Sequence, residues 1–243
     1  MIDERGLTEL VTRLKAAARG NLLSVVLYGS AATDEFRPGH SDLNILCVLQ
    51  SLGRDDLSKL HAAADWWVKK GHPAPRLLTQ HELQHSSDIF AIELWDIKAA
   101  HRTLHGEDVI ASLDVPMNLH RLQVERELRN NTLRLRQHYL RHPADRRKTL
   151  ELMTSSISTF AALFRHALIA LGQEPPATKR AAVERLASLL GFDPSPFDTI
   201  LAVREGHKRG RDVDVQVTFD AYLDRVAKVT EEIDRRLANV VAP

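Results

Sequence analysis

The pattern of strand-forming and helix-forming residues changes near Pro116, and this change limits the chain to a two-part architecture. Upstream, two apolar runs rich in branched side chains, residues 23–28 and 43–49, are flanked by segments with helical spacing. Downstream, every segment has helical spacing and strand-like runs almost vanish. We therefore expect an α+β protein with a small mixed-sheet domain over residues 1–115, followed by an all-helical bundle over residues 116–243.

The individual elements follow from apolar periodicity and from the Gly and Pro residues that interrupt it. In the first part this gives the order helix, strand, strand, helix, strand, helix and a last edge strand. The expected strands span residues 23–28, 43–49, 75–79 and 102–104, and the expected helices include residues 7–14, 55–70, 89–101, 119–141, 147–171, 179–190, 197–207 and 219–240.

Composition excludes several classes of protein. The 243 residues are 44% hydrophobic and 27% charged, as in ordinary globular proteins, so neither disorder nor a fibrous repeat is expected. The 33 Lys and Arg nearly balance the 32 Asp and Glu, and with a net charge of +1 we expect no nucleic-acid partner. The twelve His lack the HExxH spacing of a helical zinc site, which argues against a zinc enzyme.

The cysteine usage and the N-terminus favour a cytoplasmic protein. Cys47 is the single cysteine and lies in an apolar run, where we expect a buried, unreactive thiol. The first residues carry no signal pattern, and no apolar run approaches the ~20 residues that span a bilayer. We therefore expect no membrane partner.

The polar residues with the clearest chemistry lie at the ends of the first two expected strands. Gly29 lets the backbone approach a ligand, and the N–H groups of a following short helix, together with the Ser30 hydroxyl, suit a phosphate. On the next strand Asp42 and Asn44 are two residues apart, so we expect both side chains on one face of the sheet. Ser41 lies beside them. An oxygen pair beside a phosphate cradle predicts bound Mg²⁺.

This arrangement resembles the signature of the DNA polymerase β-like nucleotidyltransferase superfamily, which is Gly-Ser after a strand, a short helix and loop, then Asp-x-Asp on the next strand. The layout of the two domains is similar to that of the aminoglycoside adenylyltransferases. The resemblance implies Mg²⁺-dependent binding of an NTP and transfer of a nucleoside monophosphate to a hydroxyl. It further implies that Asp42 and Asn44 are the catalytic metal ligands and that Gly29, Ser30 and Ser41 surround the phosphates.

The chain departs from this signature at two of its three carboxylates. Asn44 stands where the second acid is expected, and its amide oxygen ligates a metal without adding charge. The third acid is expected on the strand at residues 75–79, which instead carries Arg76, a candidate for binding the nucleotide phosphates. Acids that would restore the site from elsewhere are Glu93 and Asp96 on the next helix and Asp34 and Glu35 in the loop.

Two hypotheses from different classes follow. The first is NTP binding with transfer of a nucleoside monophosphate to a hydroxyl of a small molecule or protein. The second, motivated by the missing carboxylates, is a catalytically degenerate nucleotidyltransferase acting as a regulatory or scaffold protein, with a partner or a second copy of the chain bound by the helical domain. The sequence leaves open which of the two holds, and so whether the chain is an enzyme.

Residues 121–148 form a locally basic segment, with nine Lys and Arg against three acids. One interpretation is a surface for RNA or for an acidic partner, which would bind in a strongly salt-dependent way. The commoner explanation, which we favour, is a solvated helix face whose charges are partly paired with acids elsewhere, because few aromatic residues interleave the basic ones.

Overall fold

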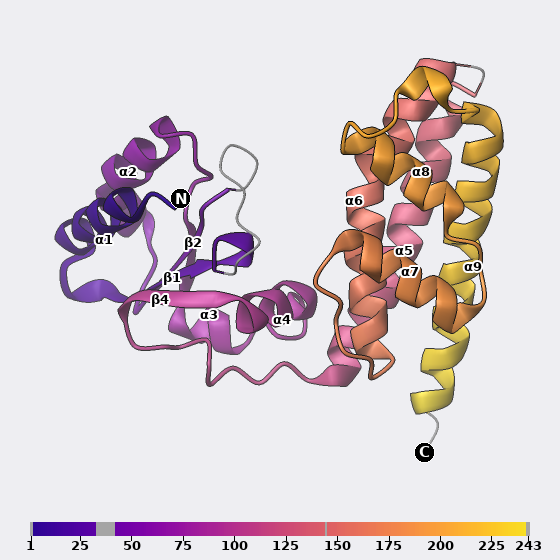
Figure 1. The fold of residues 1–243 in the computed structure, drawn as a ribbon. Helices are drawn as coiled ribbons and strands as arrows, with labels where there is room; N and C mark the ends of the chain where they lie inside the picture. Colours follow the sequence, from indigo (N-terminus) through magenta and orange to yellow (C-terminus); the bar gives the residue numbers. More distant parts are fainter. Residues whose placement is uncertain (1, 33–41, 144, 242–243) are drawn as a thin grey trace. The chain divides into compact units, whose positions relative to one another are not determined.

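The structure is a computed structural model that describes residues 2–32, 42–143 and 145–241, with side chains for all of these except residues 30 and 237–241 (Figure 1). The chain divides into two compact units, Met1–Leu119, here called the sheet unit, and His120–Pro243, here called the helical unit. Among the described residues, all strands belong to the sheet unit. The predicted fold class, a small mixed sheet followed by an all-helical part, is confirmed.

The sheet unit alternates helices and strands as the apolar patterns predict. Its α3 is an additional short helix, which follows β3 directly because Thr79 caps it: the Thr79 hydroxyl accepts from the Glu82 N–H, and the Glu82 carboxylate accepts from the Thr79 N–H. The elements are α1 (Glu4–Ala18), η1 (Arg19–Asn21), β1 (Leu22–Tyr28), η2 (Gly29–Ala32), β2 (Asn44–Leu49), α2 (Arg54–Lys69), β3 (Arg76–Thr79), α3 (Gln80–Gln84), α4 (Ala91–Ala99) and β4 (His101–Gly106).

The four strands form one mixed sheet in the order β3-β2-β1-β4. The central strand β1 pairs antiparallel with both β2 and β4, whereas β2 and β3 are parallel. A parallel pair needs a crossover, and α2 provides it. The sheet therefore places the end of β1 beside the beginning of β2, with Tyr28 opposite Asn44.

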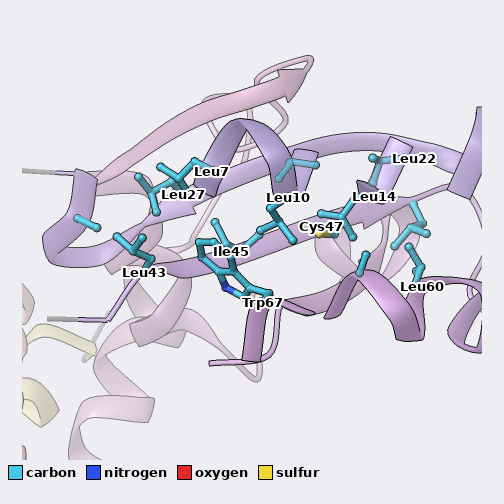
Figure 2. Packing of buried hydrophobic residues seen from close by; sticks show 14 residues of the cluster. Leu7, Leu10, Leu14, Leu22, Leu27, Leu43, Ile45, Cys47, Leu60 and Trp67 are labelled. Carbon is cyan, nitrogen blue, oxygen red and sulfur yellow. The ribbon is translucent and has the colours of Figure 1, made fainter. Parts of the chain in front are cut away.

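One face of the sheet packs against α1 and α2 (Figure 2). The α1 leucines Leu7, Leu10 and Leu14 are three and four residues apart, so they share one side of the helix and are buried together. From α2, Trp67 is fully buried in the same cluster. Cys47 lies in this core as expected, and burial raises the pKa of its thiol to about 12.

The opposite face packs against α3 and α4. It carries the alternate strand residues Val26, Leu46 and Val48, which are buried with Leu83 of α3 and Leu94 of α4. With both faces covered, the middle of β1 and β2 is buried on both sides, which explains why these strands read as continuous apolar runs.

Gly106, the last residue of β4, allows this strand to approach β1 very closely. Gly106 has φ +79°, and a Cβ at this position would lie 1.8 Å from the main-chain oxygen of Leu23 on β1. No side chain fits between two backbones at that distance, so only glycine allows this close pairing.

The boundary between the two units lies after Leu119, a few residues beyond the domain boundary expected after residue 115. The reason is that α5 (Met117–Leu140) begins in the sheet unit, where Leu119 packs against the core that contains α4. The helix then continues into the helical unit from His120.

In the helical unit, α6 is the central helix and contacts α7, α8 and α9. Aromatic rings interlock around it, with Phe164 edge-on to Phe197 at 5.3 Å and Phe160 edge-on to Tyr222 at 6.0 Å between ring centroids. The helices of this unit after α5 are α6 (Arg146–Ala170), α7 (Lys179–Leu190), α8 (Ser195–Arg204), the short η3 (Gly210–Asp212) and α9 (Val215–Val241).

The helix α6 is long and apolar enough, by length and composition alone, to cross a membrane, which corrects the expectation that no segment approaches this limit. The sequence analysis missed it because hydroxyl and small side chains interrupt its apolar run. Of its most apolar stretch, 56% is buried within the structure, as is typical of the core helix of a helical bundle.

Candidate functional site

The chain turns sharply where β1 ends, and this turn carries the first of the predicted site residues. Gly29 has φ +78°, a left-handed conformation that favours glycine, and it begins the short helix η2. Its N–H donates to the main-chain oxygen of Ala100 at 3.0 Å, just after α4. The turn is therefore held between the sheet and the end of a helix.

The side chain of Asn44 lies next to this turn. Asn44 is the first residue of β2, is half-buried and pairs across the sheet with Tyr28. A Cβ on Gly29 would lie 3.5 Å from the Asn44 Nδ2 atom. The structure thus brings together two residues that the sequence analysis assigns to one site, the glycine of the turn and the amide of the second strand.

Asp42 precedes the strand and is exposed, so its carboxylate is open to solvent. Between it and Asn44, Leu43 is buried in the core formed with α1 and α2. The imidazole of His72 lies within electrostatic range: burial lowers the pKa of His72, and the negative charges of Asp3 and Asp42 partly oppose this lowering. His72 itself is half-buried and lies 4.2 Å from the Trp67 ring, measured between centroids.

Arg76 begins β3 and pairs in register with Leu46, so it shares the sheet face that carries Asn44. The same face holds Tyr28. Burial raises the pKa of the Tyr28 phenol, and the positive charge of Arg76 partly opposes this rise. The guanidinium is therefore close enough to act on Tyr28, and it is exposed at this end of the sheet.

Several predicted residues are not placed by the structure. Ser41, together with the loop acids Asp34 and Glu35, lies outside the described residues, and so does the side chain of Ser30. Glu93 and Asp96 are half-buried on α4. In the ranges that the structure describes, no three His, Cys, Asp or Glu side chains are grouped as a metal ion would require.

Sequence reasoning missed two residues near the site, Tyr28 and His72. A signal for Tyr28 was available, because it alternates with Val26 along β1 and closes the strand directly before the Gly29 turn. No local signal marks His72, which approaches Asp42 only through the fold.

The arrangement offers groups of two kinds at one end of the sheet. A glycine turn followed by a helix start presents main-chain N–H groups, and Arg76 adds a guanidinium; both suit phosphate oxygens. Asp42 and Asn44 offer one carboxylate and one amide oxygen, which are ligand types that Mg²⁺ accepts.

Comparison with known proteins supports the fold. No family model matches the chain, and no curated protein matches it in sequence. Among solved structures, the chain is similar to the spectinomycin adenyltransferase AAD(9) from Enterococcus faecialis, whose crystal structure contains ATP and spectinomycin. The two share 16% sequence identity with a TM-score of 0.59, over 92% of this chain and 99% of the other. The chain thus has a nucleotidyltransferase-like fold.

Proposed function

We propose that the protein binds a Mg²⁺–NTP complex at the end of the sheet and transfers the nucleoside monophosphate to a hydroxyl of a small molecule. The observation that carries this proposal is the proximity of the Gly29 turn to the Asn44 side chain, in a fold similar to an adenyltransferase along nearly the whole chain. In the proposed site, Gly29, Ser30 and Ser41 surround the phosphates, and Arg76 neutralises part of their charge.

The residues present fit one magnesium ion that arrives with its nucleotide. Mg²⁺ usually keeps several waters and takes one or two protein carboxylates in addition to substrate phosphates. Asp42 supplies an exposed carboxylate and Asn44 a neutral oxygen. When bound, Mg²⁺ would offset the negative charge of the triphosphate. With one charged ligand instead of three, we expect weak metal binding without nucleotide and slow turnover.

Calorimetric titration tests the binding step. Wild-type protein is titrated with ATP, GTP, CTP and UTP, with and without Mg²⁺, beside the Asp42→Ala variant. We expect saturable binding that requires Mg²⁺ and that weakens about tenfold or more in the variant, because the carboxylate is the only charged metal ligand proposed.

Asp55→Ala is the matched control. Asp55 is also an exposed acid of the sheet unit, but it lies in the first turn of α2. If both variants bind the nucleotide as the wild type does, Asp42 holds no metal and this part of the proposal fails.

The transfer step is tested separately. Pyrophosphate release is measured in the presence of hydroxyl compounds, beginning with spectinomycin, the ligand of the similar structure.

A degenerate, non-catalytic nucleotidyltransferase fold with a regulatory or scaffold role is the second candidate. It is favoured by Asn44, which stands where the signature has its second carboxylate, and by Arg76 on the strand where the third is expected. Absence of binding for all four nucleotides would favour this candidate. Binding of a nucleotide without pyrophosphate release from any acceptor would favour a nucleotide-sensing form of it.

A further inference from the structure

Within the basic segment at residues 121–148, two groups of residues have distinct surroundings in the helical unit. One group is used inside the unit: Arg129 forms ion pairs with Glu125 and Asp234 at 2.8 and 2.6 Å, and Arg146 donates to two main-chain oxygens. These contacts account for part of the basic excess in the way the sequence analysis favoured. The other group, Arg134 and Lys148, lines a groove between α5 and α6.

The groove contains a cavity of about 360 Å³, lined by residues of the last turn of α5, by His142 and by residues of the first turns of α6. Its lining includes His138, His142, Lys148 and Ser155. A second cavity of about 160 Å³ continues along the same two helices, shares His138 and Ser155, and adds Arg134. The larger cavity is within the range of volumes that small-molecule sites occupy.

One wall of the groove carries basic groups, of which Arg134 and Lys148 are permanently charged at neutral pH. Arg134 and His138 are four residues apart on α5 and so share one side of the helix, and His142 follows two residues after the helix ends. From α6, the Lys148 Nζ atom lies 3.2 and 3.3 Å from the two ring nitrogens of His142. In the described part of the chain, no ion pair joins any of these four groups to a carboxylate.

Two acids lie near this wall, and each is engaged by a basic residue, Glu151 by Arg147 and Asp145 by Lys148. Glu151 lines the larger cavity and lies 3.4 Å from the Arg147 guanidinium. Asp145 caps α6, and the hydrogen bond that it accepts from the Lys148 N–H is the main cause of its lowered pKa. The groove thus retains an excess of positive charge at the N-terminal end of α6, where the helix dipole also favours an anion.

Hydroxyl groups of α6 also line the two cavities. Thr149 and Ser155 line the larger cavity, and Ser156 and Thr159 line the smaller one. Thr149 and Ser155 donate to carbonyls of their own helix. Since hydroxyl protons rotate, these groups are able to donate to a ligand oxygen instead.

We propose that this groove binds the phosphate groups of a small phosphorylated molecule, at a site distinct from the end of the sheet. Basic side chains and hydroxyl donors that line the same groove match a group with several acceptor oxygens and more than one negative charge, which describes a phosphate better than a single carboxylate.

Metal-free titration tests the proposal. Full-length protein in EDTA at fixed ionic strength is titrated calorimetrically with pyrophosphate and with ADP, which distinguish an inorganic from a nucleoside source of the phosphates. We expect saturable binding of at least one of them that weakens about tenfold or more in Lys148→Met and in His138→Gln, the size expected for a lost charge-assisted hydrogen bond. Circular dichroism verifies that the variants are folded.

Arg136→Met is the matched control, because Arg136 is an exposed cation on α5 that does not line either cavity. It should change the affinity by less than about twofold, because Arg136 contributes no group to either cavity. An equal loss in this variant would show diffuse attraction and would overturn the proposal. So would a loss confined to Arg76→Met, which would place the anion at the end of the sheet, or binding of single-stranded RNA without binding of either phosphate compound.

Histidine resonances give a direct second measurement. In protein labelled with ¹³C at histidine rings, pyrophosphate should shift the signals of His138 and His142 and leave His61 unchanged, because His61 is exposed on α2 of the sheet unit. Shifts of all three signals to a similar extent, or of none, would contradict binding in the groove.

Discussion

Replacement of Gly29 by alanine separates a role in ligand binding from a role in the fold. Gly29 has φ +78°, and a left-handed conformation costs an L-residue about 1 to 2 kcal/mol. An added Cβ would lie 3.5 Å from the Asn44 Nδ2 atom, which is an ordinary contact, so no further steric cost arises. We expect Gly29→Ala to lower the free energy of unfolding by about 1 to 2 kcal/mol and to leave the protein folded.

The effect of this variant on nucleotide binding should be larger than its effect on stability. If phosphate oxygens approach the backbone at the turn, the methyl group occupies their space, and Mg²⁺–NTP affinity should fall about tenfold or more. Urea denaturation gives the stability, and calorimetric titration of the folded variant gives the affinity.

Gly71→Ala supplies the matched control for backbone strain. Gly71 also has a left-handed conformation, with φ +92°, and a Cβ there would meet no atom within 4 Å. It should lose a similar amount of stability and keep the nucleotide affinity of the wild type. Unchanged affinity in Gly29→Ala, or an equal loss of affinity in Gly71→Ala, would refute the assignment of the Gly29 turn as a phosphate cradle.

Three further predictions concern stability. Gly106→Ala should cost at least about 3 kcal/mol in urea denaturation or prevent folding, because its Cβ would lie 1.8 Å from the Leu23 oxygen; a cost below 1 kcal/mol would contradict this. Trp67→Ala should cost about 3 to 5 kcal/mol by the same assay, since the ring is fully buried, and a near-neutral effect would show that the core does not depend on it. Hydrogen bonds from the guanidiniums of Arg235 and Arg236 lower the pKa of Glu232 from its ordinary 4.5 to about 2. The ionised carboxylate therefore stabilises the folded state above pH 4.5, and this stabilisation is lost as the pH falls to 2. Glu232→Gln should therefore be less stable than the wild type by up to about 1 kcal/mol at pH 6 and equal to it at pH 2, and a constant difference in denaturation across this range would contradict the linkage.

The elements of the fold were predictable because each follows from a local pattern. The spacing of Leu7, Leu10 and Leu14 already specifies a helix with one buried side, and the apolar runs specify β1 and β2. The short helix α3 escaped attention although Thr79 and Glu82 give its capping signal, because five residues carry too little periodicity to be noticed.

The candidate site was predictable only in part. The positions of Gly29 and Asn44 follow from the predicted ends of the first two strands. Antiparallel pairing of these strands brings the two residues together. The approach of His72 to Asp42 depends on how α2 and the chain after it return to the sheet, and no local spacing encodes that path. The groove in the helical unit likewise requires α5 and α6 to lie side by side, so the basic residues could be counted from the sequence but not assigned to a cavity.

The buried position of Cys47 has a practical consequence for spectroscopy. Since this single cysteine is enclosed in the core and stays protonated at neutral pH, maleimide reagents should leave it untouched while the protein is folded. Cysteines introduced at exposed positions, one in each unit, can therefore be labelled on the natural background with no need to remove a native thiol. Pairs of fluorophores or spin labels attached in this way would report whether nucleotide or pyrophosphate changes the distance between the two units.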